Sequence, residues 1–445
     1  MRQALTIRGL VPPRADQGED LDTEKADPRP EDDQHNELHL PVSDSCVVYD
    51  FRQHSSHAPI DLSFGVLQAV LYDCRGILAN ATHASTFNYI QGADRSLQVA
   101  TFAAAAQWVS RTQATPWLQI NALEAYQGVR GTLQALNVKT MLPPVVVATL
   151  ILTCGSLAYF ETFSKGWQCK DWIYHFTAIK HIMQLAGPWT FRNPVSRNAL
   201  RIERSILQFM ACCERRHTFL DLAEWKTVPY DRIEQQDMMY YASALIPGIL
   251  ENCDILAQGK LPADEHEQLL IATLSHSDQC MDTLSELLES MDNVSTTAFL
   301  HSVSLESGIS KFRAMCFMYM LILGCNIRGL RQLMLGSIAQ HDISAHLYDL
   351  PMLEHYARQL CAVVHTILHD ELEGTQAFHF FTSTQLVIIR QYHDLVEPSD
   401  ASLRQMLMET CAEAEQLVEQ NPHAEISRAL GDWARLSRLL DIRRH

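Results

Sequence analysis

Apolar residues recur at spacings of three and four along most of this chain, and this periodicity restricts the fold more than any other feature. Trp172, Phe176, Ile179 and Met183, for example, follow one another at spacings of four, three and four. Such a stripe lies on one face of an α-helix. Sustained two-residue alternation is lacking in the sequence, so sheets are at most minor. We predict an all-α fold, a multi-helix domain of stacked antiparallel helices around one continuous core.

Prolines and a glycine mark the ends of the predicted helices. Pro116, Pro144 and Pro262 each open a helix, because proline suits the first helical position. Gly187 followed by Pro188 ends the helix that begins near position 171. The same apolar spacing predicts further helices over 199–213, 312–323, 353–368, 376–392, 403–418 and 429–444.

The first 58 residues have a different composition. Segment 1–45 contains eleven Asp or Glu, five Lys or Arg and five Pro, with few large apolar residues. It buries too little apolar surface to offset its ordering entropy, so we predict a disordered acidic tail over 1–58 and a helical domain over 59–445. Residues 31–37 of this tail superficially resemble the metal-binding acidic motif of isoprenoid cyclases, but they follow two prolines in a polar context.

The charge balance is acidic, with 52 Asp and Glu against 35 Lys and Arg and a formal net charge of −17. A protein that coats nucleic acid by neutralising phosphates needs the opposite excess, so direct DNA binding is doubtful. Arg197, Arg201 and Arg204 form one positive helix face. We interpret this face as solvated or ion-paired rather than phosphate-binding.

The cysteines and the most apolar segment indicate in which cellular compartment the protein is expected. Twelve cysteines are scattered without a Cys-x-x-Cys pair, which is typical of buried thiols in a reducing compartment. The first ten residues lack the apolar core of a secretory signal. The uncharged run 145–160 is shorter than the roughly 20 residues of a spanning helix, so we expect a buried core helix and no membrane contact.

Motifs for phosphate-cradling loops and for a hydrolase nucleophile are missing from the sequence. His365 and His369, four apart on a helix, could chelate one ion, but threonine replaces the general-base glutamate of H-E-x-x-H. Cys212, Cys213 and His217 form a second cluster, in which adjacent cysteines point about 100° apart on a helix. We interpret both clusters as structural and predict no catalytic residue, metal or cofactor.

Five short sequence motifs, called phrases below, follow one another between residues 117 and 230. They are Asn121–Gln127, Tyr159–Phe163 at the end of an apolar helix, Trp172–His175, the Gly187-Pro188 stop, and an arginine-pair, Thr-Phe-Leu, Glu-Trp phrase over 215–225. Their order and spacing resemble the helical regulatory domain of fungal zinc-cluster (binuclear Zn/Cys6) transcription factors. The resemblance is strongest over 100–260, and beyond that the chain shows only a general helical pattern.

The residues that match the family's phrases are Glu161, Trp172, His175, Gly187, Pro188, Arg215, Arg216, Thr218, Phe219, Glu224 and Trp225. Trp172 and His175 lie three apart on one helix face, where we expect His175 to bond a neighbouring helix. The residues from 215 to 225 flank a sharp chain reversal that ion pairing would fix. We expect all of these residues to determine the fold rather than to contact a ligand.

The family's N-terminal DNA-binding module, with six cysteines among basic residues, has no counterpart here, since residues 1–60 contain only Cys46. The resemblance therefore implies the regulatory half of such a factor: a non-catalytic, pathway-specific transcriptional regulator or co-regulator, for example of a secondary-metabolite gene cluster. Its implied partners are a DNA-binding protein, the transcription machinery or a small-molecule effector. Its implied location is the nucleus, although no basic import patch is visible and a cytoplasmic location is the alternative.

Two other functions fit the predicted architecture. One is an all-α, cyclase-like enzyme that works in an apolar helical cavity, supported by residues 31–37 and the histidine pair at 365 and 369. The other is a helical scaffold that binds another protein through a groove. Converging carboxylates or imidazoles around a cavity would distinguish the enzyme from the two non-catalytic functions.

Overall fold

The computed structural model describes residues 95–113, 116–135, 142–165, 171–231, 233, 235–293, 305–334, 348–372, 380–396, 400–420 and 439–440. These residues are 90% helical, with 12 α-helices and no strand among them. The predicted all-α fold is therefore confirmed for the described part of the chain. All of these residues belong to the second of the two units into which the chain divides, Phe51–His445.

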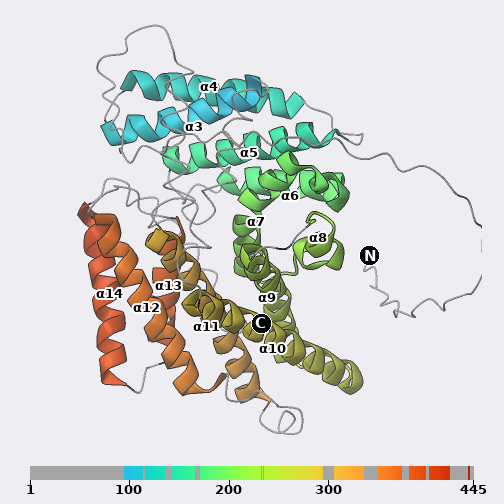
Figure 1. The fold of residues 1–445 in the computed structure, drawn as a ribbon, viewed down its shortest axis with the longest axis vertical. Helices are drawn as coiled ribbons and strands as arrows, with labels where there is room; N and C mark the ends of the chain where they lie inside the picture. Colours follow the sequence, from blue (N-terminus) through green and yellow to red (C-terminus); the bar gives the residue numbers. More distant parts are fainter. Residues whose placement is uncertain are drawn as a thin grey trace, which may run out of the picture. The chain divides into compact units, whose positions relative to one another are not determined.

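Figure 1 shows the helices in chain order. They are α3 (Arg95–Gln113), α4 (Pro116–Ala135), α5 (Pro144–Lys165), α6 (Asp171–Ala186), η2 (Pro188–Arg192), α7 (Pro194–Glu214), η3 (Phe219–Asp221), α8 (Ala223–Thr227), α9 (Gln235–Ala257), α10 (Ala263–Asn293), α11 (Leu305–Leu333), α12 (Leu350–Leu372), α13 (Phe380–Val396) and α14 (Ala401–Gln420). Elements η2 and η3 are short 3₁₀-helices.

The helix boundaries follow local chemistry. Helices α4 and α5 begin at Pro116 and Pro144, as the sequence predicts, because proline lacks only an N–H that the first turn does not use. Helix α6 ends at Gly187, whose φ of 70° is in the left-handed region that favours glycine. Helix α7 is capped by Asn193, whose side chain accepts a hydrogen bond from the Val195 N–H at 3.0 Å.

Two predicted segments are only partly described. The helix expected over 376–392 begins at Phe380, and 376–379 lie outside the described residues. The helix expected over 429–444 also lies outside them, except for Leu439 and Leu440, which form a turn. The predicted acidic tail over 1–58, including the 31–37 motif, is outside the described residues as well.

Helix α5 is apolar on all sides because it has neighbours on several sides. It packs against α3, α6 and α7, and Ile151, Leu157 and Ala158 are completely buried. One 18-residue window in the described part of the chain, Pro144–Glu161 of this helix, is long and apolar enough to cross a membrane. Since 72% of that window is buried inside the fold, it is equally typical of a core helix and is weak grounds for a membrane span.

The later helices continue the same core. Helix α9 packs against α10 and α11, and α11 packs against α12 and α13. Gly324 of α11 leaves room for Leu353 of α12, because a Cβ at position 324 would lie 2.3 Å from Cδ2 of that leucine. The buried apolar residues from α3 to α14 form one cluster, which also includes Leu439 and Leu440.

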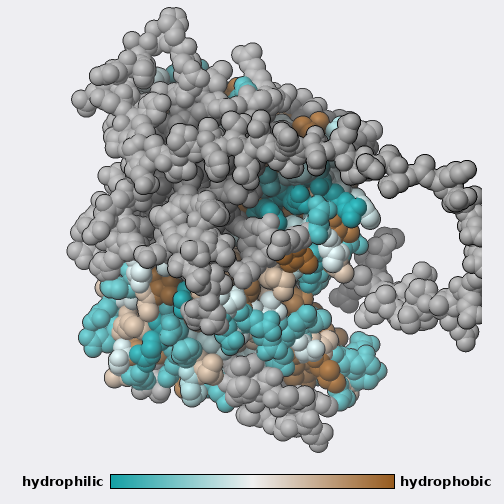
Figure 2. Space-filling model, viewed as in Figure 1, coloured by the Kyte–Doolittle hydropathy of each residue, from teal (hydrophilic) through white to brown (hydrophobic). Residues whose placement is uncertain are grey.

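The described surface is mixed in character. On the face that Figure 2 shows, hydrophilic residues cover much of the described surface, and hydrophobic patches lie between them. Several large apolar side chains are exposed on the first helices, among them Trp117 and Ile120 of α4 and Tyr174 of α6. Scattered exposed apolar residues are normal on folded proteins and by themselves indicate no interface.

A buried carboxylate lies between α5 and α7. Glu203 of α7 is completely buried, and its Oε1 would lie 2.5 Å from a Cβ built on Gly155 of α5. Real Cβ atoms do not approach another atom so closely. Position 155 therefore needs glycine, because the Glu203 carboxylate occupies the space that a Cβ would fill. Glycine stands there although it is a poor helix former.

We predict that Gly155→Ala lowers the free energy of unfolding, by about 1–3 kcal/mol, because the added methyl group displaces a buried carboxylate. Gly128→Ala is the matched control. It changes a helical glycine of α4 that has nothing within 4 Å of an added Cβ, so better helix propensity should leave stability unchanged or raised. Urea unfolding of both variants measures the difference, and a Gly155→Ala protein as stable as Gly128→Ala would contradict this explanation.

Candidate functional site

The chain corner after α7 contains the last of the five phrases. Helix α7 ends at Arg215, the only non-glycine residue with positive φ among the described residues, at φ 53° and ψ 52°. Its backbone N–H donates to the carbonyl of Cys212 at 3.0 Å, and that of Arg216 donates to Ala211 at 3.1 Å. The left-handed turn closes the helix and directs the Arg215 side chain inward, where only 3% of the residue is exposed.

The Arg215 guanidinium joins three distant parts of the fold. Its Nε and Nη2 donate to the two carboxylate oxygens of Asp254 in α9, at 2.8 and 2.7 Å. Nη2 also donates to Oδ1 of Asn326 in α11 at 2.9 Å. The Asn326 amide in turn donates to the carbonyl oxygen of Leu439 at 2.8 Å. The bidentate pair with Asp254 and the bond to the Asn326 amide engage Nε and Nη2, and Nη1 lies 3.5 Å from the Leu439 carbonyl oxygen.

The other matched residues of this corner, from 216 to 225, form a buried group and an exposed group. Trp225 of α8 is buried against two rings, with centroids 4.7 Å from Phe219 and 5.4 Å from Phe191. Thr218 caps η3 by accepting from the Leu220 N–H. Arg216 and Glu224 are exposed. The ion pair expected to fix this corner is therefore made by Arg215, with an aspartate of α9 rather than with Glu224.

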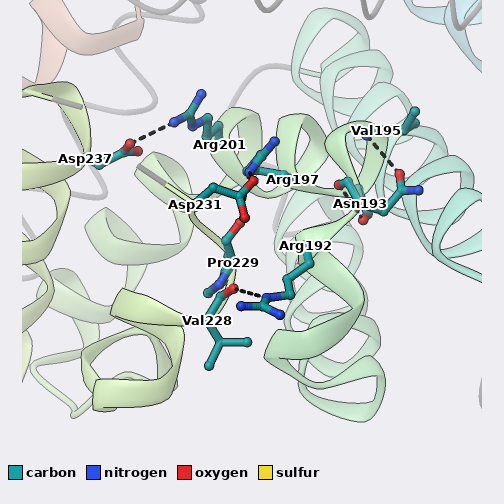
Figure 3. A network of polar contacts seen from close by, with 10 residues as sticks. Arg192, Asn193, Val195, Arg197, Arg201, Val228, Pro229, Asp231 and Asp237 are labelled. Carbon is teal, nitrogen blue, oxygen red and sulfur yellow. Dashed lines mark hydrogen bonds and ion pairs between the residues drawn. The ribbon is translucent and has the colours of Figure 1, made fainter. Parts of the chain in front are cut away.

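The positive stripe on α7 is ion-paired, as Figure 3 shows for two of its residues. Arg197 donates to Asp231 at 3.0 Å, and Arg201 donates to Asp237 at 2.8 Å. Arg204 is buried, donates to the other oxygen of Asp237 at 2.6 Å, and also donates to the Tyr230 hydroxyl at 2.7 Å. These bonds anchor α7 to α9 and the segment before it, in keeping with the structural interpretation of the stripe.

Of the two suspected metal clusters, the structure describes the cysteine cluster fully and the histidine pair only in part. Cys212 and Cys213 are buried, whereas His217 is exposed and its backbone N–H donates to Glu251 at 2.8 Å. His365 is exposed on α12, and the side chain of residue 369 is outside the described part. Within that part, no group of three or more His, Cys, Asp or Glu side chains could hold a metal ion.

A cavity of about 490 Å³ lies between α4, α5 and α6. Most of its wall is aliphatic, and its polar side chains come from two of the five phrases and their flanks. The lining residues are Tyr126, Arg130, Leu133, Leu150, Cys154, Leu157, Asp171, Tyr174, His175, Ala178 and Ile182. Of the residues predicted to determine the fold, His175 is the one that lines this cavity.

The Tyr126 hydroxyl is the centre of the cavity's polar end. It donates a hydrogen bond to Glu161, whose residue is only 1% exposed, and it lies 3.4 Å from Nε2 of His175. Its ring stacks on Phe160 with centroids 4.3 Å apart. Burial, and the adjacent Glu161 carboxylate, raise the pKa of Tyr126, so the phenol stays protonated.

Burial also sets the charge states of His175 and Cys154. It lowers the pKa of His175 below the ordinary 6.5, against the opposing effect of Glu161 and Asp171, so the imidazole is neutral at neutral pH. Burial, with the charge of Glu203, raises the pKa of Cys154 to about 12. A thiol with such a pKa is not a nucleophile. The cavity is therefore suited to binding an apolar molecule that offers hydrogen bonds at one end.

The cavity could not be predicted from the sequence, although two of its lining residues stand in quoted motifs. Tyr126 belongs to the quoted Asn121–Gln127 phrase and lies one helical period from Arg130. Nothing in the sequence places Tyr126 of α4 within reach of His175 of α6, because their approach depends on how both helices pack against α5. The structure therefore adds Tyr126, Arg130 and Asp171 to the candidate site.

Comparison with known proteins adds no further assignment: no family model, no curated protein and no solved structure matches this chain.

We predict that Arg215→Ala lowers the free energy of unfolding by about 3–5 kcal/mol, because it leaves the Asp254 carboxylate buried without its cation. Arg216→Ala, which truncates the neighbouring exposed side chain, is the matched control and should change stability by less than about 0.5 kcal/mol. Urea unfolding of the pair checks this. Equal losses in the two variants would show that the corner does not depend on the buried guanidinium.

His175 should make stability depend on pH. Its pKa in the fold is below that of the unfolded chain, so between the two values the unfolded state binds more protons. Stability is therefore complete above about pH 6.5 and falls as the pH drops below it. We predict that His175→Gln flattens this decline. Unfolding free energies of wild type and variant at pH 7.5 and 5.5 test it, and parallel losses in both proteins would contradict it.

Proposed function

We propose that this chain is a non-catalytic transcriptional regulator or co-regulator that acts through contacts with other proteins. The observation that carries the proposal is the order of the five phrases between 117 and 230, which resembles the regulatory domain of fungal zinc-cluster factors. Their residues lie on the consecutive helices α4 to α8 and are joined to α9 and α11 by buried polar bonds. A regulatory domain of this type needs a stable helical body that presents surfaces to partners.

The acidic charge supports indirect action on DNA. The net charge is −17, and the arginines of the α7 stripe are engaged with Asp231 and Asp237. Cations held in such pairs contribute little to phosphate binding. We therefore propose that a separate DNA-binding protein, or the transcription machinery, is the partner, and that the protein acts in the nucleus.

The cyclase-like alternative receives less support. Its acidic motif over 31–37 falls outside the described residues, and His365 is exposed on α12 while the cavity belongs to α4, α5 and α6. The cavity's polar end consists of a protonated phenol, a neutral imidazole and one cation near two carboxylates. Turnover of an isoprenoid diphosphate by the purified protein would favour the enzyme and count against the regulator.

We predict that the chain changes transcription when it is tethered to a promoter. The test fuses it to a heterologous DNA-binding domain and measures one reporter with low basal output and one with high basal output. Activation of the first or repression of the second is expected. The Arg216→Ala fusion should behave like wild type, whereas Arg215→Ala should lose the effect because the helical body is destabilised. Reporter output unchanged by the wild-type fusion on both promoters would overturn the proposal.

We also predict weak direct DNA binding by the untethered chain, because its negative charge opposes approach to phosphates. Gel shifts at physiological salt, with genomic fragments from the source organism, measure this. Tight, sequence-selective binding would refute the indirect mode of action while leaving a regulatory function in place.

A further inference from the structure

We propose that the cavity between α4, α5 and α6 binds a neutral, largely apolar small molecule that carries one hydroxyl-type group, such as a phenol or an alcohol. As an effector site this inference rests on the proposed function, whereas the binding itself does not. The size of the cavity, the direction of its hydrogen bonds and the balance of its charges all favour such a ligand.

The size and the wall suit an apolar ligand. A volume of about 490 Å³ lies within the range of roughly 300–1,000 Å³ that is typical of sites for small organic molecules. Leu133, Leu150, Leu157 and Ile182 supply aliphatic surface from all three helices. A polar ligand would lose its hydration on this wall without compensation.

The polar end selects a group that can both donate and accept. Tyr126 uses its only proton in the bond to Glu161, so towards the cavity its oxygen can only accept. His175 is neutral and has one N–H and one bare nitrogen, whichever tautomer is present. A ligand hydroxyl donates to one of these acceptors and accepts from Arg130 or from the imidazole N–H.

The charges of the lining favour a neutral ligand. The lining contains one cation, Arg130, and one carboxylate, Asp171, and the imidazole between them is neutral. The nearby Glu161 carboxylate is buried behind the Tyr126 hydroxyl. An anion would be attracted by Arg130 but repelled by two carboxylates, and a cation would be attracted by the carboxylates but repelled by Arg130. Neither ion gains enough attraction to offset its desolvation.

The test is a competition assay with the full chain. The fluorescent probe is N-phenyl-1-naphthylamine, a neutral apolar dye whose fluorescence rises when it leaves water. We expect it to bind and to be displaced by 2-naphthol at a concentration about tenfold lower than by 2-naphthoate, which has the same rings but a negative charge. Equal displacement by both competitors would overturn the preference for a neutral ligand.

Two substitutions and one matched control locate the binding site. Ala178→Trp fills the cavity from α6 and should abolish dye binding, whereas Ala362→Trp, at an exposed position of α12, is the matched control and should bind dye like wild type. His175→Phe retains an apolar wall but removes the imidazole. It should keep the dye and lose most of the preference for 2-naphthol.

Circular dichroism and a thermal melt accompany each variant, so that a folding defect is distinguished from a filled cavity. If Ala178→Trp does not fold, the smaller Ala178→Leu should still weaken dye binding. Dye that binds folded Ala178→Trp as it binds wild type would overturn the site. Dye binding that fails while the tethered chain still controls its reporter would refute the cavity alone, and the reverse result would refute the regulatory function alone.

Discussion

The fold depends most on the buried guanidinium of Arg215. A cation completely removed from water is tolerated only when its donors are paired, and here a carboxylate of α9, an amide of α11 and nearby backbone carbonyls pair with them. The residue accepts a left-handed backbone conformation that costs roughly 1–2 kcal/mol, because this turn is what directs the side chain inward. The helices before and after the corner are therefore fixed to one another by chemistry as well as by apolar packing.

The same principle, a polar group buried with chosen partners, organises the region around α5. This helix has a hydrophobic exterior, yet Glu203 packs against its glycine, and Glu161 near its end accepts from Tyr126. The Tyr126–Glu161 bond helps to specify which helix faces meet, because a shifted register would leave the Glu161 carboxylate without this donor. The cavity lies beside this pair, so Tyr126, at its polar end, is held in place by the core.

Much of the helical architecture could be predicted from the sequence, because the apolar stripes and the prolines act locally. Pro116, Pro144 and Gly187 delimit helices where expected. The partners of Arg215 could not be predicted, since Asp254 and Asn326 are 39 and 111 residues away and nothing in the local pattern singles them out. For the same reason, the sequence pointed to the pair Arg215-Arg216 but could not show which of the two side chains turns inward.

The bond between Asn326 and Leu439 links parts of the chain that are synthesised at different times. The Asn326 amide that contacts Arg215 also donates to the Leu439 carbonyl, 113 residues further along. During synthesis, a nascent chain contains the arginine, the aspartate and the asparagine long before this last acceptor leaves the ribosome. Until then the Asn326 amide lacks the Leu439 carbonyl as an acceptor, so this part of the buried network is completed only late in synthesis.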